Sequence, residues 1–236
     1  SQMWAVSDDG IHFETLGELF PHPEGLTKDV RDPMVWQGKN GHYFLILGAQ
    51  HSNKMGDIII YESIDFKNWS FRGSLIENQL LDVRGYMLEC PNFIEVDGKQ
   101  ILMFSPQGLA ADPKNNRYEN IHNTGYVIGQ FDEKSARFNV ITDFKEVDHG
   151  FEFYAPQTMI APDGRRIMWG WAGMMTPERE AAVPTIQNRK WVHVLSLPRE
   201  LHVNDKLQLV QQPITEIIDT TVLTSFDNVS IGQYRI

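Results

Sequence analysis

The stretch Gly85-Tyr86-Met87-Leu88-Glu89-Cys90-Pro91-Asn92-Phe93 decides the fold of this chain. In it a carboxylate and the only cysteine of the sequence stand directly before a proline, and the proline opens an apolar run. We expect a carboxylate in this position to face a pocket rather than open solvent. The stretch therefore indicates both a strand and a candidate site.

Two other segments repeat this order of residues: Arg31-Asp32-Pro33-Met34-Val35-Trp36 and Phe153-Tyr154-Ala155-Pro156-Gln157-Thr158-Met159-Ile160. Each continues through a turn that contains glycine into a second apolar run, as the first stretch does through Asp97-Gly98. Asp-Gly supplies the positive φ of a tight hairpin turn, and the first residue of a strand tolerates the N–H that proline lacks. The three segments therefore predict three β-hairpins, each with a first strand that begins at its proline.

The spacing of these copies indicates a larger repeating unit. Pro33, Pro91 and Pro156 lie 58 and 65 residues apart, and the strand and turn around Ser7 recur around Ser63, 56 residues later. A repeat of this length fits a four-stranded blade of a β-propeller, in which the two serine patterns are outer hairpins of successive blades. The sequence thus predicts an all-β fold.

The remaining chain sets the domain boundaries. The segment around Pro177 indicates a loop, Asn204-Asp205-Lys206 turns a last hairpin, and no helix of normal length is predicted. We predict residues 1–212 to be a partial β-propeller that begins in the middle of a blade, so we expect an N-terminal part of the protein to be missing. Residues 213–236 are predicted to be a linker and the first strands of a second β domain.

Composition excludes several classes of function. The formal charge of −10 and the pI near 5.2 disfavour binding to nucleic acid or to an anionic membrane, because both require a basic face. No apolar run reaches the ~18 residues that span a bilayer, and Ser1-Gln2-Met3-Trp4 does not begin a signal peptide. We expect a cytoplasmic protein with a small-molecule substrate and no partner among nucleic acids or membranes.

Two carboxylates are the first candidates for chemistry. If the strands that follow the prolines are the innermost strands of successive blades, Asp32 and Glu89 occupy nearly equivalent positions at the mouth of one central funnel. A converging pair of carboxylates suits general acid/base or glycosidic chemistry, although most such side chains merely face solvent. Aromatic residues that could pack against sugars are spread along the same repeats, although many serve only the core: Trp36, Tyr86, Tyr154, Trp169 and Trp171.

Four ordered motifs resemble the family-32 glycoside hydrolases, most closely the bacterial sucrose-6-phosphate hydrolases and β-fructofuranosidases. They are Arg31-Asp32-Pro33, Glu89-Cys90-Pro91, Phe153-Tyr154-Ala155-Pro156-Gln157-Thr158 and Leu197-Pro198-Arg199-Glu200-Leu201. The resemblance covers about residues 1–215. It implies a five-bladed β-propeller followed by a β-sandwich, and a retaining cleavage of terminal β-fructofuranosyl bonds without metal or other cofactor.

The resemblance also implies roles for individual residues. Glu89 matches the general acid/base, and Asp32 matches the carboxylate that holds fructosyl hydroxyls and stabilises the transition state. Arg31 is expected to anchor neighbouring sugar hydroxyls and Asp32. Three further residues are expected to border the pocket and bind substrate: Tyr154, Gln157 and Trp171. Cys90 is expected to point to the opposite face of its strand, where it serves packing.

One motif of the family is absent. Its nucleophile is the aspartate of an Asn-Asp-Pro-Asn-Gly motif, and the 236 residues contain no such sequence. The only other Asp-Pro pair, Asp112-Pro113, lies in a polar loop with no strand after it. We therefore expect the 236-residue chain by itself to be inactive, although the full-length protein is expected to be a glycosidase.

Three functions remain open from the sequence. Besides a fructosidase that acts on sucrose or sucrose 6-phosphate, the chain fits a non-catalytic carbohydrate-binding propeller and a fructosyltransferase or fructan hydrolase of the same architecture. Selectivity for a phosphorylated sugar would require a basic group near the pocket. The candidates are His51, Lys54 and Arg84.

Overall fold

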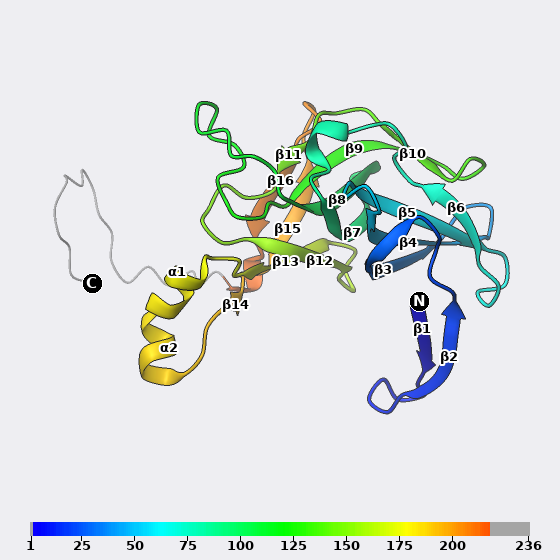
Figure 1. Ribbon diagram of the computed structural model, residues 1–236, viewed down its shortest axis with the longest axis horizontal. Coiled ribbons are helices and arrows are strands. Elements are labelled where there is room, and N and C mark those ends of the chain that lie inside the picture. The colour runs from blue at the N-terminus through cyan, green and yellow to red at the C-terminus, as the bar shows by residue number, and fades with distance from the viewer. Residues whose placement is uncertain (1, 218–236) are drawn as a thin grey trace.

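The computed structural model describes residues 2–217, which fold mainly into antiparallel β-sheets (Figure 1). The first large sheet has the order β3 (Leu26–Gln37), β4 (Tyr43–His51), β5 (Gly56–Ser63) and β6 (Ser70–Ser74). The second contains β7 (Met87–Val96), β8 (Lys99–Gln107), β9 (Gly125–Asp132) and β10 (Arg137–Val140), and β11 (Lys145–Glu146) also pairs with β9. The third contains β12 (Tyr154–Ile160), β13 (Arg166–Ala172), β15 (Arg199–Val203) and β16 (Leu209–Pro213), with β14 (Val194–Leu195) paired to β13.

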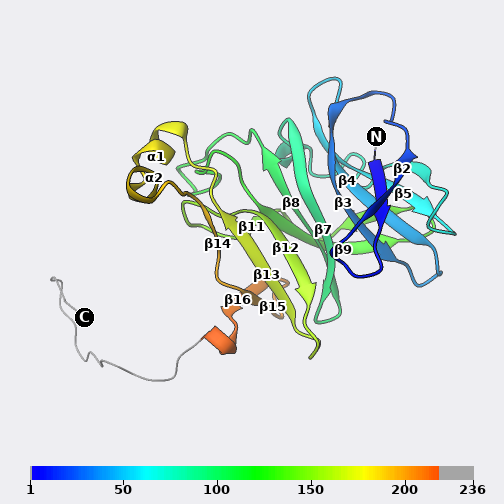
Figure 2. The same cartoon turned by 90° about the horizontal axis from the view of Figure 1, so that it is seen from below.

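The strand order confirms the predicted repeat. In the first two sheets the four strands follow one another in sequence, and each sheet begins with the strand that carries a quoted proline. This meander is the topology of a propeller blade. The three sheets lie side by side, with β7 in contact with β3 and β4 on one side and with β12 on the other (Figure 2). The strand of Glu89 is therefore the centre of the described structure.

The prediction that these strands begin at their prolines is wrong. The strands begin two to seven residues earlier, and each has a register shift at its proline. The residue before each proline has a positive φ: 63° at Asp32, 48° at Cys90 and 47° at Ala155. A β-bulge accommodates a proline inside a strand because the ladder is already interrupted there. The repeated motif thus encodes a bulge rather than a strand start.

Apolar side chains fill the two spaces between neighbouring sheets. The first cluster joins the β3–β6 and β7–β10 sheets, with Phe44 and Ile60 on one side and Leu88 and Phe104 on the other. The second cluster joins the β7–β10 sheet to the β12–β16 sheet through residues that include Ile94, Met103, Phe153 and Met168. Because β7 contributes to both clusters, its register is fixed from both sides.

Gly48 of β4 allows the first two sheets to approach each other closely. A methyl group at this position would lie 2.1 Å from the carbonyl oxygen of Leu88 and 3.2 Å from Cα of Glu89. The first contact is shorter than real Cβ atoms make and the second is tight, and both neighbours are backbone atoms that cannot rotate away. Gly48 therefore sets the distance between β4 and the part of β7 that carries Glu89.

We expect Gly48→Ala to lower the free energy of unfolding by about 1–3 kcal/mol, because overpacking must displace backbone. The urea midpoint of the whole protein measures this effect. Gly150→Ala is the matched control, since a methyl there would meet chiefly the side-chain oxygen of Asp148. Equal stability of the two variants would contradict the role of Gly48.

The predicted outer hairpins share one turn geometry. β1 (Gln2–Val6) pairs with β2 (Glu14–Phe20), and in the turn between them the Asp9 carboxylate accepts backbone N–H groups of Ile11 and His12. In the turn between β5 and β6, the Asp65 carboxylate accepts the backbone N–H groups of Lys67 and Asn68 in the same way. The first hairpin extends away from the main body and contacts it through Phe20, whose ring stacks on Tyr61 at 4.1 Å (Figure 1).

The segment predicted to be a loop around Pro177 contains two short helices, α1 (Pro177–Ala182) and α2 (Pro184–Arg189). Thr176 caps the first, since its side chain accepts the N–H of Arg179 and proline occupies the first turn. The described part also contains two 3-10 turns, η1 (Leu81–Val83) and η2 (Thr215–Ile217). Within residues 2–217 no helix has the length and apolarity to cross a membrane. Most of the second β domain predicted for residues 213–236 lies outside the described residues.

Candidate active site

Glu89 lies where the three sheets meet, and both of its carboxylate oxygens accept hydrogen bonds. Oε1 accepts from Arg31 of β3, whose Nε and Nη2 lie 2.8 and 2.5 Å away. Oε2 accepts from the hydroxyl of Tyr154 in β12 at 2.6 Å and from Nε2 of Gln107 in β8 at 2.7 Å. The side chain is 15% exposed. Four donors satisfy the ionised carboxylate, and its partial exposure leaves it within reach of a bound molecule.

Arg31 connects Glu89 to a second carboxylate that the sequence did not single out. Its Nη1 donates to Oδ1 of Asp29 at 3.0 Å, so the guanidinium pairs with Glu89 and Asp29 rather than with Asp32 as expected. Burial by itself lowers the pKa of Arg31, but the hydrogen bonds and charges of Glu89 and Asp29 together raise that pKa above its usual value. Arg31 is therefore a fixed positive charge beside Glu89.

Asp32 lies beside Glu89 because its side chain bonds the backbone of the next residue, Cys90. Its Oδ2 accepts the backbone N–H of Cys90 at 2.9 Å, and the Sγ of Cys90 lies 3.6 Å from the same oxygen. The two carboxylates that the repeats predicted to converge are thus brought together. The expectation that Cys90 points to the other face is wrong, because the bulge breaks the alternation of side chains at this residue.

Cys90 does not have the character of a nucleophile. Burial raises the pKa of its thiol to about 12, and the nearby charges of Asp32 and Glu89 act in the same direction. The thiolate is the reactive form of cysteine. The side chain therefore remains a neutral thiol that packs beside Asp32.

The three predicted pocket residues lie in different surroundings. Tyr154 donates a hydrogen bond to Glu89. Burial is the main cause that raises the pKa of its hydroxyl, and the bond to Glu89 raises it further. Gln157 lies further along β12, where its Oε1 accepts from Asn92 at 3.0 Å. Trp171 pairs with Tyr154 in the β12–β13 ladder, and its ring packs edge-on against His193 at 4.7 Å. Of the three, Tyr154 is the residue bonded to Glu89.

Sequence reasoning missed Gln107 and His122, which lie in and after the β8 strand. Gln107 bonds Glu89, and an isolated bridge pairs it with His122. The His122 ring lies 6.3 Å from the ring of Tyr86 and 6.0 Å from that of Tyr154, and burial lowers its pKa although the charge of Glu89 opposes the change. The segment Ser105-Pro106-Gln107 ends β8 opposite the first residues of β7, where Gln107 pairs with Met87 and Ser105 with Glu89, and this antiparallel pairing was the available signal.

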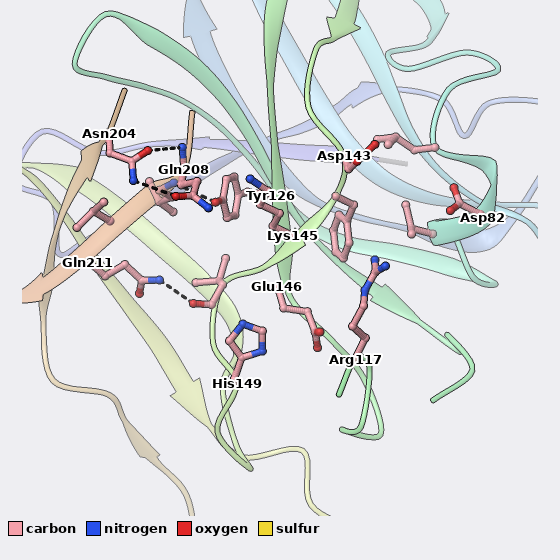
Figure 3. A pocket seen from close by; sticks show the side chains of 16 residues that line it. Asp82, Arg117, Tyr126, Asp143, Lys145, Glu146, His149, Asn204, Gln208 and Gln211 are labelled. Atoms are coloured by element: carbon pink, nitrogen blue, oxygen red, sulfur yellow. Dashed lines mark hydrogen bonds between the residues drawn. The ribbon is translucent and has the colours of Figure 1, made fainter. Parts of the chain in front are cut away.

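A groove of about 770 Å³ lies between the second and third sheets, apart from this cluster (Figure 3). None of the site residues proposed from the sequence lines it. Many of its polar groups bond one another: Gln211 donates to the Val147 carbonyl at 2.6 Å, and Asn204 donates to Gln208 at 3.1 Å. The groove is therefore a crevice between sheets, and the candidate site is the cluster around Glu89.

Comparisons with known proteins agree with one family. Residues 1–213 match the family described as "Glycosyl hydrolases family 32 N-terminal domain". The sucrose-6-phosphate hydrolase of Bacillus subtilis is 39% identical over 219 residues, which are 92% of this chain and 44% of that protein. The chain thus spans less than half the length of this relative.

Solved structures give the same result. The family-32 β-fructofuranosidase of Bombyx mori has a TM-score of 0.78 and 34% identity, over 92% of this chain and 44% of that one. A variant of that enzyme, with an aspartate replaced by alanine, was solved in complex with sucrose. The sucrose-6-phosphate hydrolase of Lactobacillus gasseri has a TM-score of 0.77 and 31% identity, over 91% of this chain and 43% of that one.

Proposed function

The chain belongs to glycosyl hydrolase family 32, and from this premise we propose that the whole protein cleaves terminal β-D-fructofuranosyl bonds of sucrose or sucrose 6-phosphate. The observation that carries the proposal is the placement of Glu89, with donors from three sheets on its two oxygens and Asp32 beside it. The names of the similar proteins support the same class of substrate.

In this proposal Glu89 is the general acid/base. It protonates the leaving glycosidic oxygen and then removes a proton from the water that releases fructose. Tyr154 supports this exchange because its hydroxyl can serve both protonation states of Glu89. It donates a hydrogen bond to Oε2 of the ionised form, and it can accept one from the protonated form. Arg31 holds the other oxygen in place, so the proton is exchanged at the oxygen that faces Tyr154 and Gln107.

Asp32 is proposed to bind fructosyl hydroxyls and to stabilise the positive charge that develops on the sugar in the transition state. A carboxylate fixed by the N–H of Cys90 does not have to reorient when that charge appears. The positive φ of Asp32 is uncommon for a residue other than glycine, and strained backbone of this kind occurs at functional sites. Gln157 and Trp171 are proposed to border the sugar further from the reacting bond.

A retaining mechanism requires a second carboxyl group ~5–5.5 Å from Glu89 that attacks the anomeric carbon. The family resemblance assigns this role to the aspartate of an Asn-Asp-Pro-Asn-Gly segment, and the 236 residues contain no such sequence. The same proposal includes a five-bladed propeller, of which the three large sheets are blades, followed by a β-sandwich.

The test incubates the whole protein with sucrose, sucrose 6-phosphate and an inulin-type fructan, and analyses the products. We expect free fructose and the intact leaving sugar in equal amounts, with retained anomeric configuration in the first fructose released. Longer fructosyl oligosaccharides would identify a fructosyltransferase instead. Binding of sucrose without any cleavage would identify a carbohydrate-binding propeller and refute the proposal.

A further inference from the structure

The turn between β4 and β5 holds one lysine in a defined position. The N–H of Lys54 donates to the His51 carbonyl at 2.8 Å, and the His51 N–H donates to the Met55 carbonyl at 2.9 Å. Ser52 bonds the Gly25 carbonyl through both its N–H and its hydroxyl. These bonds fix the backbone from which the exposed side chain of Lys54 extends.

Gln50 directs Lys54 toward the start of β7. The Lys54 ammonium donates to Oε1 of Gln50 at 3.2 Å, while Nε2 of Gln50 donates to the Tyr86 carbonyl at 2.7 Å. Gln50 lies two residues after Gly48, so both face β7 from the same side of β4. Gly48 lies against Glu89, whereas Gln50 lies against Tyr86, three residues nearer the start of β7.

A short series of bonds connects this position to the acid/base. The N–H of Tyr86 donates to the Gln107 carbonyl at 2.9 Å, and the side chain of Gln107 donates to Glu89. Tyr86 itself is 42% exposed. Lys54 is therefore linked through Gln50 to the backbone of Tyr86, three residues before Glu89, and we call Lys54, Gln50 and Tyr86 the rim of the site. The exposed Tyr86 is an aromatic residue on which a sugar can pack.

The other two basic candidates for phosphate recognition are engaged in pairs. Arg84 is 2% exposed and bonds Asp57 and the carbonyls of Glu77 and Gln79. His51 lies 2.8 Å from the second oxygen of Asp57. Both face the buried Asp57, so the guanidinium of Arg84 and Nε2 of His51 are already paired with a carboxylate.

Lys54 differs from His51 and Arg84 because its positive charge is not paired with a carboxylate within the described residues. Within residues 2–217 its ammonium forms no ion pair, and its hydrogen-bond partner is a neutral amide. Arg31, the cation that bonds Glu89, is already paired with Glu89 and Asp29. An anionic group bound at the rim would thus meet one uncompensated positive charge with two further N–H donors available.

We propose that Lys54, oriented by Gln50, binds a phosphoryl group carried by the leaving sugar and so makes the site selective for a phosphorylated disaccharide. This inference rests on the proposed function and names the substrate class of the same site. A charge-assisted bond to a mostly exposed lysine contributes to substrate binding rather than to the chemical step, and it weakens as salt increases.

The experiment compares the whole protein with its Lys54→Ala variant on sucrose 6-phosphate and on sucrose. We expect the ratio of kcat/KM for the two substrates to fall about 10- to 100-fold in the variant, through KM rather than kcat. Lys54→Arg is expected to retain most of the ratio. Lys67→Ala removes the same charge from the turn between β5 and β6 and is expected to leave the ratio unchanged.

Two inhibitors identify the source of the phosphoryl group. Glucose 6-phosphate is expected to inhibit the wild type more strongly than glucose, and to lose this advantage in Lys54→Ala. An equal loss of inhibition by inorganic phosphate would assign the site to free phosphate and overturn the inference. So would an unchanged substrate ratio in Lys54→Ala. A wild type that cleaves neither sugar would refute the proposed function itself.

Discussion

Replacement of Glu89 by glutamine in the whole protein is expected to lower kcat for sucrose and sucrose 6-phosphate about 10²- to 10⁴-fold, the usual contribution of general acid/base catalysis. Glutamine has nearly the same shape as glutamate, and its amide oxygen can still accept from Arg31. Its NH2 group can donate to the Tyr154 hydroxyl and, once the Gln107 amide turns over, to the oxygen of Gln107. It cannot deliver a proton to the leaving oxygen. The loss therefore reports chemistry rather than folding.

A second substrate separates this role from a structural one. An aryl β-fructofuranoside with an acidic phenol as leaving group needs little protonation, so the variant is expected to form the glycosyl intermediate from it with a much smaller defect. Glu95→Gln is the matched control because Glu95 lies on the same strand with an exposed side chain. A Glu89→Gln enzyme within a few-fold of wild type on sucrose would refute the assignment of the acid/base.

Replacement of Asp32 by asparagine is expected to lower kcat/KM about 10²- to 10³-fold with little change in the melting temperature. Asparagine tolerates a positive φ better than most residues, and its oxygen can still accept the N–H of Cys90 at 2.9 Å. The substitution therefore removes the negative charge and leaves the backbone as it is. Fructose release and thermal unfolding are measured on the same preparation.

Asp32→Ala provides the comparison. Alanine loses the bond to Cys90 and places an unsupported side chain at a φ of 63°, so this variant is expected to lose stability as well as activity. A fully active Asp32→Asn protein would show that the charge of Asp32 does not stabilise the transition state. Equal melting temperatures for the two variants would show that its bond to Cys90 has no structural effect.

The sequence predicted the hairpins well because their turns and apolar runs are local. The pairs β3–β4, β7–β8, β12–β13 and β15–β16 lie where the three glycine-containing turns and Asn204-Asp205-Lys206 indicated. The predicted strand starts were wrong because each proline was taken to be the first residue of its strand. A β-bulge inside a strand tolerates a proline as the first residue of a strand does. The hydrophobic periodicity of the sequence cannot distinguish a bulge from a strand start.

The site was predicted in part for a similar reason. Glu89 and Asp32 stand next to the repeated prolines, so the repeat itself draws attention to them. Asp29 and Gln107 reach the cluster only through the register of β3 and the end of β8, which depend on pairing between strands. Arg84 was a candidate for phosphate recognition, but in the structure it is buried against Asp57. Asp57 lies 27 residues away in the sequence, and no local pattern encodes this contact.

The kinked residue before each proline also bears on how such a chain can acquire new chemistry. The same backbone step presents an acid at position 32, a thiol at 90 and a methyl group at 155, while the flanking residues Arg31, Glu89 and Tyr154 converge on one point. Duplication of one sheet would copy the step together with the strand. Substitution at this position could then change the chemistry of the site while the backbone conformation of the strand stays the same, as it does at Asp32, Cys90 and Ala155.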